Sequence, residues 1–226
     1  MKIYKTSYVK TKPKIRGPYT SIYLTRHCHA DYSAKKKLTD FEVPLSAIGR
    51  QQRAYLNKKL LSLSINTIYA SELARAQQTD EVFAKKVNKK IIIDQRLNEI
   101  NWSKWYKIKY FCMSEKKRVQ KFKNYQKTDQ RLDKAQVSAR HLIRDIYFQN
   151  QGNKVVLFCH GNLIRSIITS FLNADIIGFL SMEIYQSSIS KLVIDTDGYI
   201  KINYINNIAH LPHRPKENLF LHAIRG

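Results

Sequence analysis

Short apolar runs alternate along this chain with longer stretches in which apolar residues recur every three or four positions. The runs are rich in β-branched and aromatic residues, which favour strands, and they lie at residues 21–25, 66–70, 90–94, 155–159, 188–195 and 199–205. The longer stretches predict helices at residues 46–63, after Ser71, at residues 129–149 and at residues 161–172. This alternation predicts a mainly parallel sheet with helices on both faces, a three-layer α/β/α sandwich.

Local signals within this pattern give sharper expectations. Residues 155–159 (VVLFC) are continuously apolar, which is typical of a strand buried on both faces. Ser71 looks like the N-cap of the helix that follows, because a serine hydroxyl accepts hydrogen bonds from the N–H groups of a first turn. Asp197 and Gly198 predict the tight turn of a hairpin. The helix at residues 46–63 carries a rough apolar stripe made of Leu45, Ile48, Tyr55, Leu56 and Leu60.

Chemically capable side chains stand where four of the predicted strands end. Arg26 and His27 follow the first strand, and Arg75 lies one turn into the helix after the second. Glu99 follows the third strand, and residues 160–161 (HG) follow the long apolar strand. Ligands of open parallel sheets bind outside the carboxyl ends of the strands. We therefore expect these two histidines, two arginines and one carboxylate to meet in a single crevice.

These residue types suit a phosphoryl group. A guanidinium presents a planar fork that matches phosphate oxygens, and the helix N-termini after Ser71 and Gly161 would add backbone N–H donors. Imidazole is a nucleophile when it is neutral, and neighbouring arginines favour the neutral form. A carboxyl group kept protonated at Glu99 could give a proton to a leaving oxygen and later take one from water. The sequence therefore predicts phosphoryl transfer.

Six motifs, each weak alone, occur in one order along the chain. They are residues 24–27 (LTRH), 44–52 (PLSAIGRQQ), 71–79 (SELARAQQT), 97–105 (LNEINWSKW), 159–165 (CHGNLIR), and 188–189 together with 207–211. With these motifs the chain closely resembles the histidine phosphatase superfamily, also called the phosphoglycerate-mutase-like family, from about Ser21 to Pro212.

The resemblance implies a role for each candidate side chain. His27 would be the nucleophile that becomes phosphorylated, and Glu99 would be the proton donor. The residues that would clamp the transferring phosphoryl group are Arg26, Arg75, His160 and Gly161. No metal and no organic cofactor is implied.

Three further residues are secondary candidates. Ser33 stands six positions after His27, where the family more often has asparagine, and Asn162 lies within the second histidine motif. Asp31 is a rival to Glu99 for the role of general acid, and the sequence leaves this alternative open.

Departures from the family pattern narrow the range of expected activities and substrates. Glycine follows His160, where the acid phosphatase and phytase branch has aspartate, so the resemblance points to the branch that uses a glutamate after the third strand. Residues 100–103 (INWS) replace the R-x-Y-G usual in cofactor-dependent mutases, which argues against mutase activity. Cys28, where glycine is usual, and residues 159–165 are also similar to the mitochondrial mutase-like protein serine/threonine phosphatase. We expect a phosphatase acting on a phosphorylated metabolite or a phosphoprotein.

The charge is concentrated outside these motifs. The 226 residues carry a net charge of +23, which first suggests nucleic acid or another polyanion as partner. Residues 1–19 hold six basic residues and no acid, and residues 101–127 hold nine basic residues and one acid. We expect a basic tail at 1–19, a catalytic domain at 20–212 with a basic aromatic insertion at 101–127, and a C-terminal tail at 213–226. The two basic segments are either solvated or dock on an acidic surface or polyanion, and the insertion could act as a lid with its aromatics packed inward.

Other features bound the compartment and leave further functions open. No apolar run reaches the roughly 18 residues that a membrane span needs, and residues 1–17 lack the apolar core of a secretory signal. Three cysteines, an odd number, predict a reducing compartment such as the cytoplasm, although the acid-free basic N-terminus leaves targeting to an organelle open. A Cys28–Cys159 disulfide is a hypothesis for redox control. A phosphate-binding module without catalysis and a basic nucleic-acid-binding protein stay as alternatives. The oligomeric state has no signal in the sequence.

Overall fold

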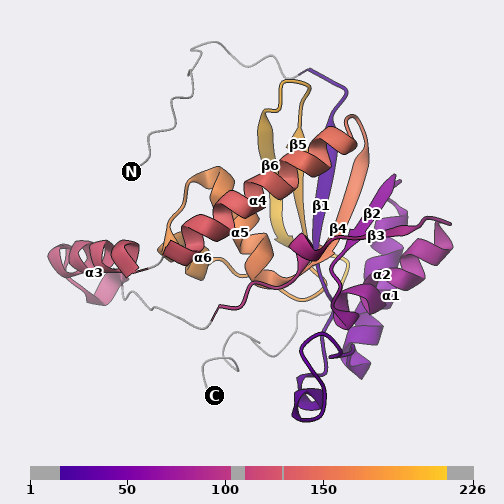
Figure 1. Ribbon diagram of the computed structural model, residues 1–226, viewed down its shortest axis with the longest axis horizontal. Coiled ribbons are helices and arrows are strands. Elements are labelled where there is room, and N and C mark those ends of the chain that lie inside the picture. Colours follow the sequence, from indigo (N-terminus) through magenta and orange to yellow (C-terminus); the bar gives the residue numbers. More distant parts are fainter. Residues whose placement is uncertain (1–15, 103–109, 129, 213–226) are drawn as a thin grey trace.

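The computed structural model describes residues 16–102, 110–128 and 130–212. Six strands form one sheet in the order β3-β2-β4-β1-β5-β6 (Figure 1). They are β1 (Thr20–Arg26), β2 (Thr67–Ala70), β3 (Ile91–Ile93), β4 (Lys154–Cys159), β5 (Ile189–Ile194) and β6 (Ile200–Asn207). The first four strands run parallel, whereas β5 is antiparallel to both β1 and β6. The predicted α/β fold with a mainly parallel sheet is confirmed.

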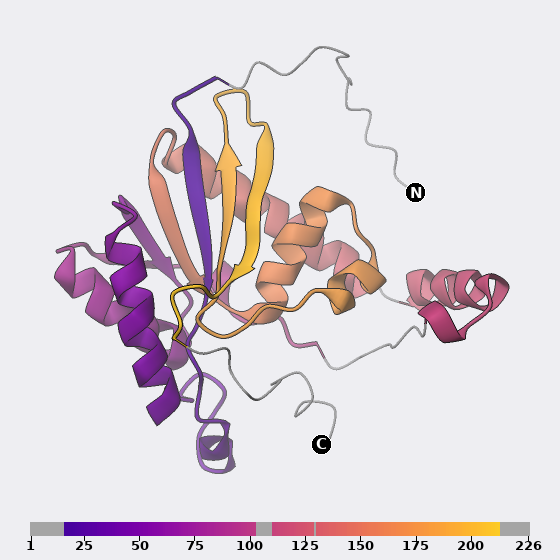
Figure 2. The ribbon, with the colours of Figure 1, turned by 180° about the vertical axis from the view of Figure 1, so that it is seen from behind.

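Helices cover both faces of this sheet, as Figure 2 shows from behind. α1 (Ala47–Leu61) and α2 (Ala74–Lys86) lie on one face, and α4 (Gln130–Gln149) and α5 (Gly161–Leu172) lie on the other. The remaining helices are α3 (Glu115–Thr128), α6 (Ile176–Ser181) and the 3-10 turns η1 (Tyr32–Lys36), η2 (Gln95–Leu97) and η3 (Tyr110–Cys112).

Alternate side chains of the central strands separate two apolar cores. Ile22 and Leu24 of β1 pack with α4 and α5, whereas Tyr23 between them packs with α1 and α2. Leu157 and Phe158 of β4 divide in the same way, so β4 is buried on both faces as its apolar run predicts. Its carboxyl end therefore lies in the middle of one sheet edge, between the ends of β1 and β2.

The apolar stripe predicted for α1 is partly wrong. Ile48 and Tyr55 are exposed, with 56% and 43% of their surfaces accessible. The buried face runs through Gly49 and Gln52 instead, because this end of α1 lies against the backbone that follows β1. A Cβ at position 49 would stand 2.0 Å from the carbonyl oxygen of His29, so only glycine fits there.

Ser71 does not cap α2, contrary to expectation. The N-cap of α2 is Leu73, which makes no side-chain capping bond. The Ser71 hydroxyl lies two residues earlier and bonds to side chains from two other segments, as described below. Its hydroxyl keeps one local bond, from the N–H of Leu73 at 3.2 Å, beside these tertiary contacts.

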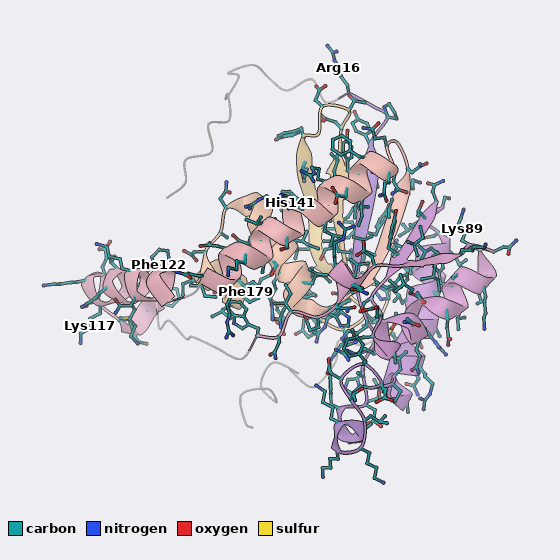
Figure 3. All side chains as sticks on the ribbon, in the orientation of Figure 1. Arg16, Lys89, Lys117, Phe122, His141 and Phe179 are labelled. Carbon is teal, nitrogen blue, oxygen red and sulfur yellow. The ribbon has the colours of Figure 1, made fainter. Side chains whose placement is uncertain are left out.

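The predicted insertion contains a helix of its own. α3 extends to one side of the molecule (Figure 1) and contacts α6, where Phe122 packs on a cluster that includes Trp102 and Phe179. The rings of Trp102 and Phe179 are 4.8 Å apart, whereas Phe111 is fully exposed, so the expected inward packing of aromatics holds for only part of the segment. Figure 3 shows Lys117 on α3 at a distance from the sheet. Trp105 and Tyr106 lie outside the described residues.

Two further expectations concern the hairpin and the membrane. β5 and β6 form the predicted hairpin, and Gly198 in its turn has a φ of +79°, a conformation that glycine adopts without strain. Within the described ranges, no helix is both long enough and apolar enough to span a bilayer. The boundaries expected at residues 19 and 212 stay predictions.

Candidate active site

The expected group of side chains comes together at the carboxyl edge of the sheet. β1 and β4 pair in register through Arg26 and Cys159, so the residues that follow them, His27 and His160, become neighbours. Their ring centroids are 5.0 Å apart. β2 pairs with β4 on the other side and leads into α2, which carries Arg75 at its second position. The structure thus brings the two histidines and their neighbouring arginines together.

His27 presents a nucleophilic nitrogen. Its side chain is 1% exposed, and its Nδ1 lies 2.6 Å from the carbonyl oxygen of Cys28. A carbonyl only accepts hydrogen bonds, so Nδ1 carries the proton and Nε2 carries the lone pair. Burial, followed by the charges of His160, Arg26 and Arg75, lowers the pKa of His27 well below its usual value. The ring is therefore neutral at neutral pH, as a nucleophile requires.

Two arginines offer buried donors that have no acceptor in the part of the chain that the structure describes. Arg75 is 2% exposed, and its Nε has no hydrogen-bond partner among the described residues. The same holds for Nε of Arg26, whose Nη1 donates to the carbonyl oxygen of Ile184. A Cβ at Gly161 would lie 3.3 Å from that Nε, so glycine leaves room for the guanidinium beside the start of α5. Buried unpaired donors are costly, and an anion bound here would satisfy them.

Glu99 lies at the same edge, held by backbone donors. Its Oε1 accepts hydrogen bonds from the N–H of Ile100 at 3.0 Å and from the N–H of Asn162 at 3.1 Å. Burial raises the pKa of Glu99, while the positive charges of Arg26 and Arg75 oppose that rise. The carboxyl group therefore keeps its proton to a higher pH than an ordinary glutamate, which suits a general acid.

The three secondary candidates fall in two places. Asn162 is the second residue of α5, and besides holding Glu99 its side chain donates to the carbonyl oxygen of Ile100 at 3.1 Å. Asp31 and Ser33 lie together at η1, where Asp31 Oδ1 accepts from the N–H of Ser33 at 3.1 Å. The structure does not bring these two residues into contact with the histidines.

Asp40 is a residue of this site that sequence reasoning missed. Arg75 donates from Nη1 to the backbone oxygen of Asp40 at 2.7 Å and from Nη2 to its Oδ2 at 3.1 Å. Burial alone would raise the pKa of Asp40, but hydrogen bonds from Lys35 and Arg75 lower it overall. A carboxylate thus occupies part of the guanidinium fork. No sequence signal marks Asp40, since the contact joins a loop to a helix 35 residues later.

Replacing Asp40 with asparagine should strengthen inhibition by inorganic phosphate about fivefold, because a half-exposed carboxylate competes with the anion for Arg75 by about 1 kcal/mol. The backbone bond from Arg75 to residue 40 is retained in this variant. Glu42→Gln is the matched control, because Glu42 bonds to Thr39 in the same loop. Equal inhibition constants for the two variants would mean that only net charge matters. The measurement is the inhibition constant for phosphate.

The two buried cysteines are poor candidates for redox chemistry. Burial raises the pKa of Cys28 to about 12, and it also raises the pKa of Cys159. Both thiols are free and protonated at neutral pH, whereas disulfide exchange requires a thiolate. Among the described residues no group of three or more His, Cys, Asp or Glu side chains is placed to hold a metal ion.

Comparisons with known proteins fit this geometry. The model of the histidine phosphatase superfamily (branch 1) matches residues 22–208. A probable phosphoglycerate mutase of Shigella boydii is 24% identical over 209 residues, which cover 84% of this chain and 94% of the relative.

Solved structures of other proteins share the fold. The phosphoserine phosphatase of Entamoeba histolytica, solved with phosphoserine, is 18% identical with a TM-score of 0.66, over 85% of this chain and 99% of that one. A mycobacterial glucosyl-3-phosphoglycerate phosphatase is 19% identical with a TM-score of 0.61, over 82% of this chain and 98% of that one.

Proposed function

Because this chain belongs to the histidine phosphatase superfamily (branch 1), we propose that it hydrolyses phosphomonoesters through a phosphohistidine formed on His27. The observation that carries the proposal is the neutral, buried ring of His27 beside donors that have no acceptor in the described part of the chain. Those donors are Nε of Arg26 and Nε of Arg75, and Nδ1 of His160 likewise has no partner among the described residues. A phosphoryl group would meet the nucleophile and these groups at once.

Turnover would take two in-line displacements at phosphorus. In the first, the lone pair of His27 Nε2 forms an N–P bond while the ester P–O bond breaks, and Glu99 gives its proton to the leaving oxygen. In the second, water attacks the phosphorus, Glu99 takes a proton from that water, and the N–P bond breaks to release inorganic phosphate. The second step thus returns His27 and Glu99 to the states in which they began.

The arginines would supply most of the acceleration. Negative charge on the equatorial oxygens must be held while the phosphoryl group moves, and preorganised donors in a dry site stabilise such charge strongly. Arg75 is almost fully buried and is anchored by Asp40, so little reorganisation is needed at the moment of reaction.

We favour a hydrolase over a mutase, and a phosphorylated metabolite over a phosphoprotein. Residues 100–103 do not fit the mutase pattern, and Trp102 within them is buried against Phe179 rather than open to a second phosphate. Two structural neighbours are a phosphoserine phosphatase and a glucosyl-3-phosphoglycerate phosphatase, both of which act on small phosphate esters.

A substrate panel tests this proposal. Purified protein is assayed for phosphate release from sugar phosphates, phosphoserine, phosphoglycerates, nucleotides and phosphopeptides, and separately for interconversion of phosphoglycerates. We expect phosphate release to be fastest with a small phosphate ester and mutase activity to be undetectable. Fastest turnover of phosphopeptides would favour the protein phosphatase alternative, and no turnover of any compound would favour a binding module.

Replacing Glu99 with glutamine should slow the hydrolysis of alkyl phosphates by about 100- to 1,000-fold. The hydrolysis of an aryl phosphate should slow much less, because a good leaving group needs no proton. The pH profile carries the same information. The raised pKa of Glu99 means that the active, protonated acid is lost only as pH rises through that pKa, so kcat/KM for alkyl phosphates falls there in the wild type. This alkaline limb should vanish in Glu99→Gln. Asp31→Asn is the control, and a leaving-group effect there instead would reassign the acid.

A further inference from the structure

Behind His160 lies a hydrogen-bond network of three residues to which no role has been given above. Its Nε2 lies 2.8 Å from the hydroxyl oxygen of Ser71, and that oxygen lies 2.9 Å from Oδ1 of Asn98. Nδ2 of Asn98 lies 2.8 Å from Oε2 of Glu72. His160 and Ser71 are both completely buried, whereas Asn98 and Glu72 are partly exposed, so the hydrogen-bond network runs from the interior to the surface.

The donor and the acceptor of every hydrogen bond in this network can be assigned. A carboxylate only accepts, so the amide of Asn98 must turn its NH₂ group to Glu72 and its oxygen to Ser71. The backbone N–H of Glu72 also donates to that oxygen, at 3.0 Å, which confirms the orientation of the amide. The single hydroxyl proton of Ser71 is therefore given to Asn98. Towards His160 the Ser71 oxygen can only accept, and it also accepts from the N–H of Leu73 at 3.2 Å.

The proton on the facing nitrogen of His160 follows from this direction. Nε2 must carry a hydrogen, so the neutral ring has its lone pair on Nδ1, which is buried and has no partner among the described residues. A phosphoryl oxygen also offers only lone pairs. Nδ1 can bond to it only when it is protonated too, which makes the ring an imidazolium.

We propose that Ser71, Asn98 and Glu72 are positioning residues that keep a proton on Nε2 of His160, so that binding of a phosphate dianion draws one further proton onto Nδ1. The inference rests on the proposed function only in placing the phosphoryl group beside His160. The proton comes from solvent or from a monoanionic phosphate, and no bond other than N–H forms. Binding of the substrate dianion thereby makes the His160 ring a cation that stabilises the bound phosphoryl group.

The charges around His160 agree with a ring that changes state on binding. Burial lowers its pKa, and Arg75 of α2 and Arg26 of β1 lower it further, whereas Asp40 of the loop before α1 opposes them. His27 faces it from the end of β1. The empty site therefore holds a neutral ring. Two negative charges on a bound phosphate would offset both arginines, so the pKa of His160 rises when the site is filled.

Calorimetry of phosphonate binding tests the proposal. Methylphosphonate, a substrate analogue whose dianion carries no O–H that could donate to Nδ1, is titrated at alkaline pH, where it is mostly the dianion, into protein in two buffers of different ionisation enthalpy. We expect uptake of about one proton per phosphonate in the wild type. In Asn98→Leu the Ser71 hydroxyl is free to donate to Nε2, so the single proton of the neutral His160 ring moves to Nδ1. Nδ1 can then donate to the ligand without a second proton, and the proton uptake should fall towards zero. Glu72→Gln is the matched control, because its amide oxygen can still accept from Asn98.

Nitrogen NMR of histidine-labelled protein reads the same change directly. The free wild type should show His160 with a proton on Nε2 alone, and methylphosphonate should add one on Nδ1. In free Asn98→Leu the proton should lie on Nδ1. An Nε2 proton that persists in Asn98→Leu, or methylphosphonate binding without proton uptake in the wild type, would overturn the proposal.

Kinetics separate this inference from the proposed function. Ser71→Ala should lower kcat/KM for an aryl phosphate by about 10- to 100-fold, the range seen when a metal-bound histidine loses its outer hydrogen-bond partner, and Ser71→Thr should restore most of it. Thermal unfolding of each variant shows whether the fold is retained. If Ser71→Ala is fully active while the nucleophile remains essential, the inference alone fails. If no variant or wild type turns over any phosphate ester, the proposed function fails.

Discussion

Replacing His27 with alanine should lower kcat/KM for an aryl phosphate by about 10⁴-fold or more, because removal of a covalent nucleophile leaves only binding and charge stabilisation. His27 is the ring whose tautomer and pKa both favour nucleophilic attack. The wild type, quenched in alkali during turnover, should carry phosphate on this ring, and the label should be lost in acid. Steady-state kinetics and phosphate labelling are the two measurements.

A second histidine variant gives this prediction a matched control. His141 lies on the exposed side of α4, as Figure 3 shows, and His141→Ala should keep wild-type kcat/KM and wild-type labelling. His27→Ala should still bind inorganic phosphate, since both arginines remain. Labelling that survives in His27→Ala would show that another residue is phosphorylated.

Replacing Asp80 with asparagine should stabilise the protein, and the gain should grow as pH rises. Asp80 is completely buried on α2, and neither of its carboxyl oxygens has a partner among the described residues. Burial, with a smaller effect from Glu81, raises its pKa to about 8. Asparagine keeps the shape of the side chain and cannot ionise, so the cost of a buried charge disappears.

The sign of the pH effect follows from proton binding. An unfolded aspartate loses its proton near pH ~4, whereas the folded chain keeps it up to about pH 8, so the free energy of unfolding falls as pH rises through that window. At neutral pH the accumulated loss is about 4 kcal/mol at most. Thermal unfolding at pH values near the two ends should therefore separate wild type and Asp80→Asn only at the alkaline end. Asp133→Asn, an exposed change on α4, should show no such difference, and equal shifts in the two variants would refute the assignment.

The regular elements could be predicted from sequence because their apolar periods match their burial. The helix expected at residues 161–172 is α5 with the same bounds, and the run at 155–159 lies in β4. α6 was missed, since six residues (Ile176–Ser181) give too short a stretch for a helical period to show. α1 (Ala47–Leu61) lies within the predicted range 46–63, but only part of its predicted apolar stripe is buried, because Gly49 and the backbone of His29 decide the packing at its start.

The site residues could be predicted where the position of a residue at the end of a strand is enough to place it in the site. His27, His160 and Glu99 follow strands or the turn after a strand, and the parallel order of the sheet brings such ends together. Asp40 and the orientation of Ser71 were not predictable in this way. Both depend on contacts between side chains from segments far apart along the chain, which periodicity and local propensity do not record.

α3 is attached to the body by a small apolar contact, in which Phe122 packs against the cluster around Phe179 of α6. It contributes no strand to the sheet and no described group to the phosphate clamp. Natural selection can therefore alter the length or charge of residues 115–128 without disturbing His27 and His160. Related chains that differ in substrate or docking partner should diverge faster in this helix than in β1 or β4, so the fold keeps its chemistry fixed while its periphery evolves.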